Sequence, residues 1–141
     1  MPKNKPLRII IDTNLWISFI ISKSLSRLDS ILFSGAVTIL LSIELIEEIE
    51  ATINKPKLKK YFREGALNKM LEAFDPYIDL VSVKSKVAVC RDVKDDFLLS
   101  LALDGMADVL ITGDKDLLVL ENYQGIQILK LSEFLEKSAH I

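Results

Sequence analysis

Short apolar runs alternate along this chain with longer stretches in which apolar residues recur every three or four positions. The runs are rich in Val, Ile and Leu, which is typical of strands buried on both faces of a parallel sheet. Strands are therefore expected at 8–12, 37–41, 79–83, 108–112 and 126–131. The longer stretches have the spacing of helices, which are expected from about 15 and from 132, and at 26–33, 42–53, 58–74 and 95–103.

Capping and helix-breaking residues mark the ends of these helices. Residues 12–14 (Asp-Thr-Asn), Ser42 and Ser132 offer side chains that can cap a first turn. Pro56 stops the helix that begins at 42. Gly65 divides the stretch 58–74 into two helical pieces.

The alternation of strands and helices predicts an α/β fold, a three-layer α/β/α sandwich around a central parallel sheet of four to five strands. Without a repeat or a linker, residues 1–141 are expected to form one domain. Ligands bind such sheets at the carboxyl ends of the strands. Asp12 and Asp114 follow two strands expected to be central, and Asp95 opens the helix that leads into the second. These three carboxylates should converge at one edge.

Composition narrows the chemistry available there. The net charge is -2, so a nucleic acid would have to bind a local basic patch. The single cysteine, Cys90, and the single histidine, His140, cannot build a zinc site or a serine triad. We expect Cys90 to be a buried thiol in a cytoplasmic protein. Asp12 interrupts the first apolar run, and the stretch 31–41 is shorter than the ~20 residues of a membrane span, so neither a signal peptide nor a membrane helix is expected.

Clustered carboxylates repel one another, and a hard divalent cation relieves that repulsion. Mg²⁺ prefers oxygen ligands and often shares them with substrate phosphates, so such a site suits phosphodiester hydrolysis. Each acid taken alone could instead cap a helix. Asp95 precedes Leu98 and Leu99 by three and four residues, which places it on their inward face and favours it over Asp96.

Four segments, in this order, resemble the motifs of PIN-domain nucleases. They are Ile-Ile-Ile-Asp12-Thr13-Asn14, the segment 42–49 that contains Glu48, the segment 91–98 around Asp95, and the segment 107–117 around Asp114. Together with the segment 54–58, the match is closest to PIN proteins that are toxin components of bacterial toxin–antitoxin systems. The resemblance implies a PIN-like fold and a metal-dependent endoribonuclease that binds one or two Mg²⁺ or Mn²⁺ ions and leaves a 5′-phosphate.

The resemblance also implies roles for single residues. One carboxylate from each motif would be catalytic and bind the metal, namely Asp12, Glu48, Asp95 and Asp114, and Asp116 would be a further metal ligand. Hydrogen bonds that orient these ligands are expected from Asn14, Thr112, Asp92 and Asp96. For Asn14 and Thr112, local capping is the alternative. Periodicity turns Glu44 and Glu47 away from the apolar stripe and leaves Glu48 and Glu50 open, and the resemblance selects Glu48.

RNA is the substrate that the resemblance implies. A basic segment with Tyr61 and Phe62 could contact it; its cations are Lys55, Lys57, Lys59, Lys60 and Arg63. The alternative is a solvated helix face. The resemblance further implies a cognate antitoxin and a homodimer, for which apolar surface near Trp16 and Phe19 could serve. Two other readings stay open: a housekeeping RNA-processing nuclease, and a degenerate PIN fold that only binds RNA or a protein.

Overall fold

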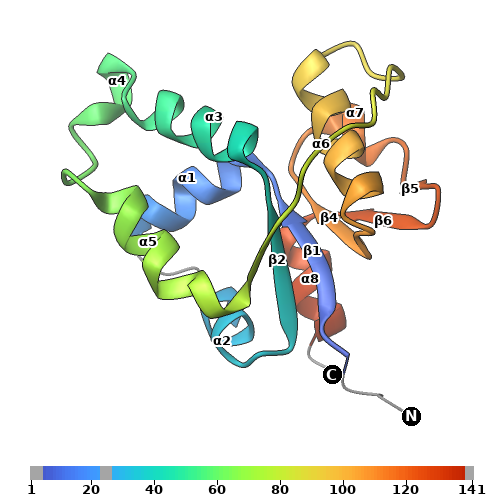
Figure 1. Cartoon of the computed structure of the whole chain (residues 1–141), viewed down its shortest axis with the longest axis horizontal. Coiled ribbons are helices and arrows are strands. Elements are labelled where there is room, and N and C mark those ends of the chain that lie inside the picture. Colours follow the sequence, from blue (N-terminus) through green and yellow to red (C-terminus); the bar gives the residue numbers. More distant parts are fainter. Residues whose placement is uncertain (1–4, 23–26, 139–141) are drawn as a thin grey trace.

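The computed structural model describes residues 5–22 and 27–138, which form a six-stranded sheet covered by helices (Figure 1). The strands lie in the order β3-β2-β1-β4-β6-β5. All neighbours run parallel except β5, which pairs antiparallel with β6. The strands are β1 (Leu7–Ile11), β2 (Val37–Leu41), β3 (Ile78–Leu80), β4 (Val109–Ile111), β5 (Asn122–Tyr123) and β6 (Ile126–Leu129). The predicted α/β/α architecture is confirmed, with a two-residue antiparallel edge strand added.

Helices connect the strands in two layers. They are α1 (Thr13–Ser22), α2 (Arg27–Phe33), α3 (Ile43–Ile53), α4 (Pro56–Lys59), α5 (Ala66–Phe74), the 3-10 turn η1 (Asp75–Tyr77), α6 (Val93–Asp104), α7 (Lys115–Leu118) and α8 (Leu131–Ser138). Helix α1 contacts both α3 and α5 on one side of the sheet, and α6 lies on the other side (Figure 1). Within the described residues, every helix is too short or too polar to cross a bilayer.

The two central strands, β1 and β4, bring the candidate acids together. Ile9, Ile10 and Ile11 in β1 and Leu110 and Ile111 in β4 are at most 1% exposed. Burying a side chain of this size contributes roughly 1.5–3 kcal/mol. In the parallel register Ile11 lies beside Ile111, and the Asp12 N–H donates to the Ile111 carbonyl at 3.0 Å. Both strands therefore end at the same level of the sheet.

Helix α3 forms where its capping residue and apolar stripe predict it. The Ser42 hydroxyl accepts a hydrogen bond from the Leu45 N–H at 3.1 Å, which caps the first turn. Leu45, Ile49 and Ile53 are buried on one face. Pro56 cannot continue the helix and instead starts α4. The stretch expected to be helical at 58–74 therefore begins with the short α4 and continues as α5 after Gly65, whose φ is 80°.

The helix expected at 95–103 begins earlier than predicted. Its first residue is Val93, because the Asp92 carboxylate accepts the Lys94 N–H at 2.9 Å and caps the helix. The α2 helix is described from Arg27, and its expected start at Ser26 lies outside the described residues, as does His140.

The expected cap of the last helix is wrong. Helix α8 starts at Leu131, so Ser132 lies within its first turn. The Glu133 carboxylate accepts the Lys130 N–H at 2.9 Å and serves the start of the helix instead. A glutamate near a helix N-terminus also interacts favourably with the helix dipole.

The apolar surface expected near Trp16 and Phe19 is not formed by these two side chains themselves. These side chains are 0% and 5% exposed, and their rings lie 6.4 and 5.5 Å, centroid to centroid, from Phe74. They form the aromatic core beneath α1 and α5. The exposed apolar side chains near them are Ile21 and Phe33, which are 42% and 46% exposed.

Candidate active site

Asp12 and Asp114 lie at the carboxyl ends of β1 and β4, and Thr112 connects them. The Thr112 hydroxyl donates to Asp12 Oδ2 at 2.6 Å and accepts the Asp114 N–H at 3.0 Å. Asp12 Oδ1 accepts the Asn14 N–H at 2.7 Å. Asp12 is 7% exposed and Thr112 is fully buried. The carboxylate of Asp12 is therefore held in one orientation through both of its oxygens.

The first turn of α6 directs two neighbouring carboxylates to different places. Asp95 is 5% exposed and faces Asp114, as the predicted inward face requires. Asp96 accepts hydrogen bonds from the backbone N–H groups of Cys90 at 2.8 Å and Val89 at 2.9 Å. These bonds hold the pKa of Asp96 below its usual value. Asp96 thus fixes the segment that leads into α6 and does not face the other acids.

Three carboxylates form a compact group. Asp95, Asp114 and Asp116 each offer one oxygen, and these oxygens all lie within 4.8 Å of one another. Burial, followed by the negative charge of Asp114, raises the pKa of Asp95 from 3.8 to about 7. The charges of Asp92 and Asp12 act in the same direction. Removing water while adding like charges makes the ionised form of Asp95 unfavourable unless a cation is near.

The turn after β4 positions Asp116 in this group. Asp114 caps α7, and its Oδ1 accepts the Asp116 N–H at 2.8 Å. This closes a tight turn that brings both side chains to the sheet edge. Asp116 Oδ1 also forms an ion pair with Arg91 at 2.8 Å. Helix α7 was not predicted, because its four residues are too few to show a helical period.

Glu48 reaches this edge from α3. The Thr13 hydroxyl, next to Asp12 in the chain, donates a hydrogen bond to Glu48 Oε2. Glu48 is half-buried, whereas the three alternatives from the sequence, Glu44, Glu47 and Glu50, are exposed. Glu48 therefore lies beside the end of β1, outside the group of three close oxygens.

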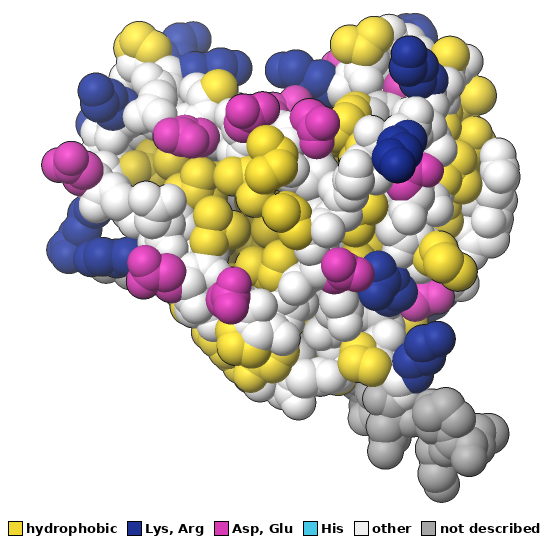
Figure 2. Space-filling view, in the orientation of Figure 1, with side chains coloured by type: hydrophobic (Ala, Val, Ile, Leu, Met, Phe, Trp, Pro, Cys, Tyr) yellow, Lys and Arg dark blue, Asp and Glu magenta, His cyan; other side chains and the backbone are white. Residues whose placement is uncertain are grey.

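The group fits a hard divalent cation. Its donors are all carboxylate oxygens, and Asp95 Oδ2 is buried without any hydrogen-bond partner. Buried polar atoms are normally satisfied, so an orphaned carboxylate oxygen beside two others indicates a missing positive partner. Figure 2 shows acidic side chains gathered at the hollow between the α3 and α6 sides of the molecule. Asp95, Asp114 and Asp116 could hold the ion, with Asp12 and Glu48 at its border.

The residues expected to orient the ligands have different roles. Thr112 donates a hydrogen bond to Asp12, whereas Asn14 contributes its backbone N–H, and its own side chain is exposed. Asp92 caps α6. Thr13, which anchors Glu48, was considered from the sequence only as a capping residue. Its position directly after Asp12 is the signal that could have identified it.

A family profile described as PIN domain matches residues 8–116, a range that contains all of these carboxylates. The chain belongs to the PIN domain family. An uncharacterized protein of Methanocaldococcus jannaschii, MJ1680, is 30% identical to this PIN domain over 119 residues. That match covers 82% of this chain and 76% of the relative.

Two solved structures share the fold of this PIN domain. A chain of the crystal structure of VapBC2 from Rickettsia felis, bound to a DNA fragment from their promoter, has a TM-score of 0.60 and 13% identity. That match covers 86% of this chain and 97% of the other. The PIN domain of human SMG5 has a TM-score of 0.52 and 11% identity, with 93% and 98% of the two chains covered. At these identities the likeness concerns the fold alone.

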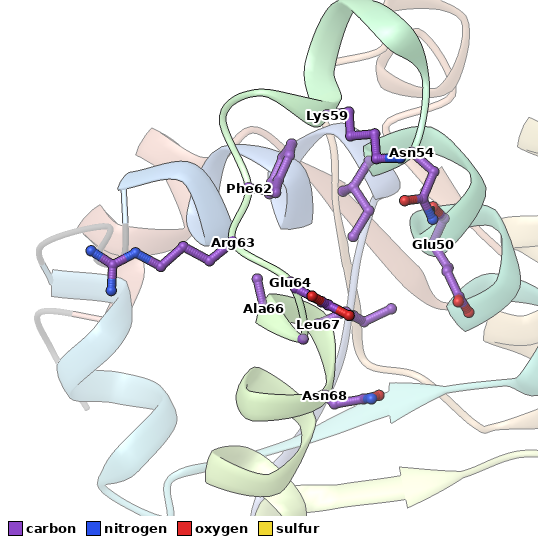
Figure 3. A pocket seen from close by; sticks show the side chains of 11 residues that line it. Glu50, Asn54, Lys59, Phe62, Arg63, Glu64, Ala66, Leu67 and Asn68 are labelled. Carbon is purple, nitrogen blue, oxygen red and sulfur yellow. Dashed lines mark hydrogen bonds between the residues drawn. The ribbon is translucent and has the colours of Figure 1, made fainter.

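Two cations of the basic segment of this PIN domain, Lys59 and Arg63, line a pocket of about 640 Å³ between α3 and α5 (Figure 3). Figure 3 shows Glu50 and Asn54 at the α3 side and Asn68 at the α5 side, whereas Arg63 extends away from them. All five predicted cations are exposed: Lys55, Lys57, Lys59, Lys60 and Arg63. Tyr61 is 57% exposed, and the Lys60 ammonium lies over its ring, 5.2 Å from the ring centroid. Basic and aromatic groups are thus both accessible along this segment.

The lone thiol is neither fully buried nor reactive. Cys90 is half-buried, and its thiol has a raised pKa because of desolvation, followed by the charge of Asp96. Together these effects raise the pKa of the thiol to about 11. Since the thiolate is the nucleophile, Cys90 is unsuited to nucleophilic catalysis.

Proposed function

We propose that this PIN domain is a metal-dependent endoribonuclease. The observation that carries the proposal is the approach of the Asp95, Asp114 and Asp116 carboxylates, one of which has a buried oxygen without a partner. PIN domains are typically metal-dependent nucleases, and the family match includes every residue of this group. Oxygen ligands of this kind suit Mg²⁺ or Mn²⁺, one or two ions, and both metals bind phosphate oxygens.

In the proposed site, some of the carboxylates would bind the metal ion directly and others would lie beside it. Asp95, Asp114 and Asp116 would hold the ion, and Asp12 and Glu48 would complete the site. A bound divalent cation lowers the pKa of water and offsets negative charge on the phosphodiester. Thr112 keeps Asp12 in place, and Thr13 keeps Glu48 in place. Such supporting hydrogen bonds orient carboxylates that would otherwise repel one another.

The substrate is proposed to be RNA that crosses from the basic segment to the acidic edge. Exposed lysines on and around α4 can bind backbone phosphates, and Tyr61 can stack on a base. The pocket between α3 and α5 borders this segment and is lined in part by carboxylates and amides that can hydrogen-bond bases. Single-stranded RNA exposes both its phosphates and its base edges to such groups.

The test is cleavage of a labelled single-stranded RNA with Mg²⁺, with Mn²⁺ and with EDTA. We expect activity only with metal and at least a hundredfold loss in Asp12→Asn, with the fold retained. Asp75→Asn is the matched control, since this exposed carboxylate lies on η1, away from the acidic edge. Cleavage by Asp12→Asn at the wild-type rate would refute the proposal, and so would cleavage in EDTA. RNA binding without any cleavage would instead favour the degenerate, binding-only PIN fold.

We further propose that the protein is a toxin with a cognate antitoxin. The likeness of its fold to a chain of the VapBC2 structure supports this role. A groove of about 600 Å³ that includes Phe33, Tyr61 and Met70 offers apolar surface to such a partner. Expression should arrest growth, and the product of a neighbouring gene should relieve the arrest. Active enzyme without growth arrest would favour the housekeeping RNA-processing nuclease.

The expected homodimer remains a prediction, which light scattering on the purified protein can test.

A further inference from the structure

Arg91 is held at the border of the carboxylate group by a single ion pair. One of its guanidinium nitrogens lies 2.8 Å from Asp116 Oδ1, while its side chain is 87% exposed. Within the described part of the chain, Arg91 is the cation that forms an ion pair with this group. Its backbone is anchored, because Asp96 accepts the N–H groups of Val89 and Cys90 just before it.

Stability does not account for this arrangement. An ion pair as exposed as the one between Arg91 and Asp116 contributes roughly 0–1 kcal/mol, because water screens it and the long side chain loses freedom. The guanidinium is nevertheless well placed for a ligand. It has five N–H donors in a planar fork that matches a phosphate group, and Asp116 engages only one side of it.

A nucleic acid needs such a cation at this position. A phosphodiester that approaches Asp95, Asp114 and Asp116 meets like charge, which opposes binding. A guanidinium at the border of the group offsets that repulsion where it is largest. The lysines of the basic segment lie on and around α4, which Figure 1 shows on the α3 side of the molecule, apart from α6 and α7. Arg91 would therefore bind the RNA on the α6 and α7 side of the acidic edge, which these lysines do not reach.

We infer that Arg91 binds a backbone phosphate of the RNA beside the carboxylate group. While no RNA is bound, Asp116 keeps the Arg91 guanidinium at this position through their ion pair. This inference rests on the proposed ribonuclease function. When Asp116 also faces a cation, its attraction for Arg91 falls and the guanidinium is freer to bind phosphate. Metal binding and RNA binding then strengthen each other, as two ligands coupled through one carboxylate must.

The first test measures RNA binding in the Asp12→Asn background, which prevents cleavage. The probe is a fluorescein-labelled single-stranded 12-mer of mixed sequence, and fluorescence anisotropy gives its Kd at several salt concentrations in Mg²⁺. Arg91→Gln should weaken binding about tenfold and reduce the slope of log K against log salt by about 0.7, the value for one phosphate contact on a single strand. Arg91→Lys should restore the slope but only part of the affinity.

The matched control is Lys137→Gln, which removes the same charge from the exposed surface of α8. It should change neither the affinity nor the slope appreciably. Because Arg91 is so exposed, Arg91→Gln should keep the wild-type Tm to within about 5 °C. A smaller slope of log K against log salt, without a large change in Tm, therefore indicates that a phosphate contact is lost while the fold is kept.

The second test asks whether Asp116 restrains Arg91. In EDTA, Asp116→Asn removes one negative charge from the protein whether or not Arg91 is present. If Asp116 holds Arg91 back, the gain in RNA affinity should be at least threefold larger with Arg91 than in the Arg91→Gln background. Double-mutant comparison isolates this coupling from the change in net charge.

The outcomes separate the inference from the function on which it rests. If Arg91→Gln changes the salt slope no more than Lys137→Gln does, Arg91 does not contact the RNA backbone. If Asp116→Asn raises the RNA affinity equally with Arg91 and with Arg91→Gln, then the ion pair with Asp116 does not keep Arg91 from binding RNA. Either result leaves the ribonuclease proposal standing if the wild-type protein cleaves RNA with metal. If the wild-type protein neither bound nor cleaved RNA, both the inference and the ribonuclease proposal would be overturned.

Discussion

Replacing Asp95 by Asn should stabilise the metal-free protein at neutral and alkaline pH. Burial and the charge of Asp114 raise the pKa of Asp95 from 3.8 to about 7 in the folded protein. The unfolded chain releases this proton near pH 4, whereas the folded protein keeps it until about pH 7. The folded state therefore binds more protons across this window, and its stability falls as the pH rises from about 4 to 7. An amide does not titrate and removes that loss.

The magnitude follows from the two pKa values. A tenfold change in proton affinity corresponds to about 1.4 kcal/mol, so the rise from 3.8 to about 7 sets a ceiling of roughly 4 kcal/mol. Water at the open side of the carboxylate group screens the charges, and we expect about half of this, ~2 kcal/mol. In a domain of this size, 1 kcal/mol moves Tm by roughly 3–5 °C. The variant should therefore melt about 6–10 °C higher than wild type at pH 8.

The assay is thermal and urea unfolding, followed by circular dichroism in EDTA at pH 4.5, 5.5, 6.5 and 8. The difference between Asp95→Asn and wild type should be small at pH 4.5 and grow until about pH 7. Asp75→Asn makes the same chemical change at an exposed carboxylate and should follow wild type at every pH. A difference that is constant across this range would refute the reasoning, because it would arise from packing and not from ionisation.

Three further predictions concern the hydrogen bonds, the cation and the packing. Thr112→Val removes the hydroxyl that joins Asp12 to Asp114, so urea unfolding should show a loss of ~1–3 kcal/mol and RNA cleavage should fall at least tenfold. Mn²⁺ should raise Tm in wild type but much less in Asp114→Asn, and crystals soaked in Mn²⁺ should show anomalous density at the acidic edge only in wild type. Gly105→Ala would place a Cβ 2.8 Å from Leu40 Cδ1, so the variant should unfold at lower urea concentration, with a loss of ~1–3 kcal/mol. An unchanged midpoint would show that Leu40 moves aside freely.

Much of the fold could be predicted from local patterns. The apolar runs that became β1, β2 and β4 are nearly continuous because both faces of a central parallel strand are buried. The α3 helix was predicted at both ends, since Ser42 and Pro56 act on the backbone within a few residues. The four-residue helix α7 and the two-residue strand β5 escaped prediction because they are too short to show a period.

Burial of single side chains was harder to predict. An apolar surface was expected near Trp16 and Phe19, and both of these side chains pack against Phe74, which lies far away in the chain. Helix α1 is apolar on most of its circumference, so its pattern does not distinguish a face covered by α5 from one open to a partner. Only the path of α5 across α1 decides between them.

The sequence by itself determined that Asp12 and Asp114 follow central strands, and it placed Asp95 on the inward side of its helix. Tertiary structure alone decided that Asp95, Asp114 and Asp116 lie within reach of one ion, that Thr13 anchors Glu48, and that Arg91 pairs with Asp116. The physical reason is the range of the forces concerned. Capping and periodicity act over one or two turns, whereas contacts between carboxylates and guanidinium groups depend on the order and register of strands that are distant in the chain.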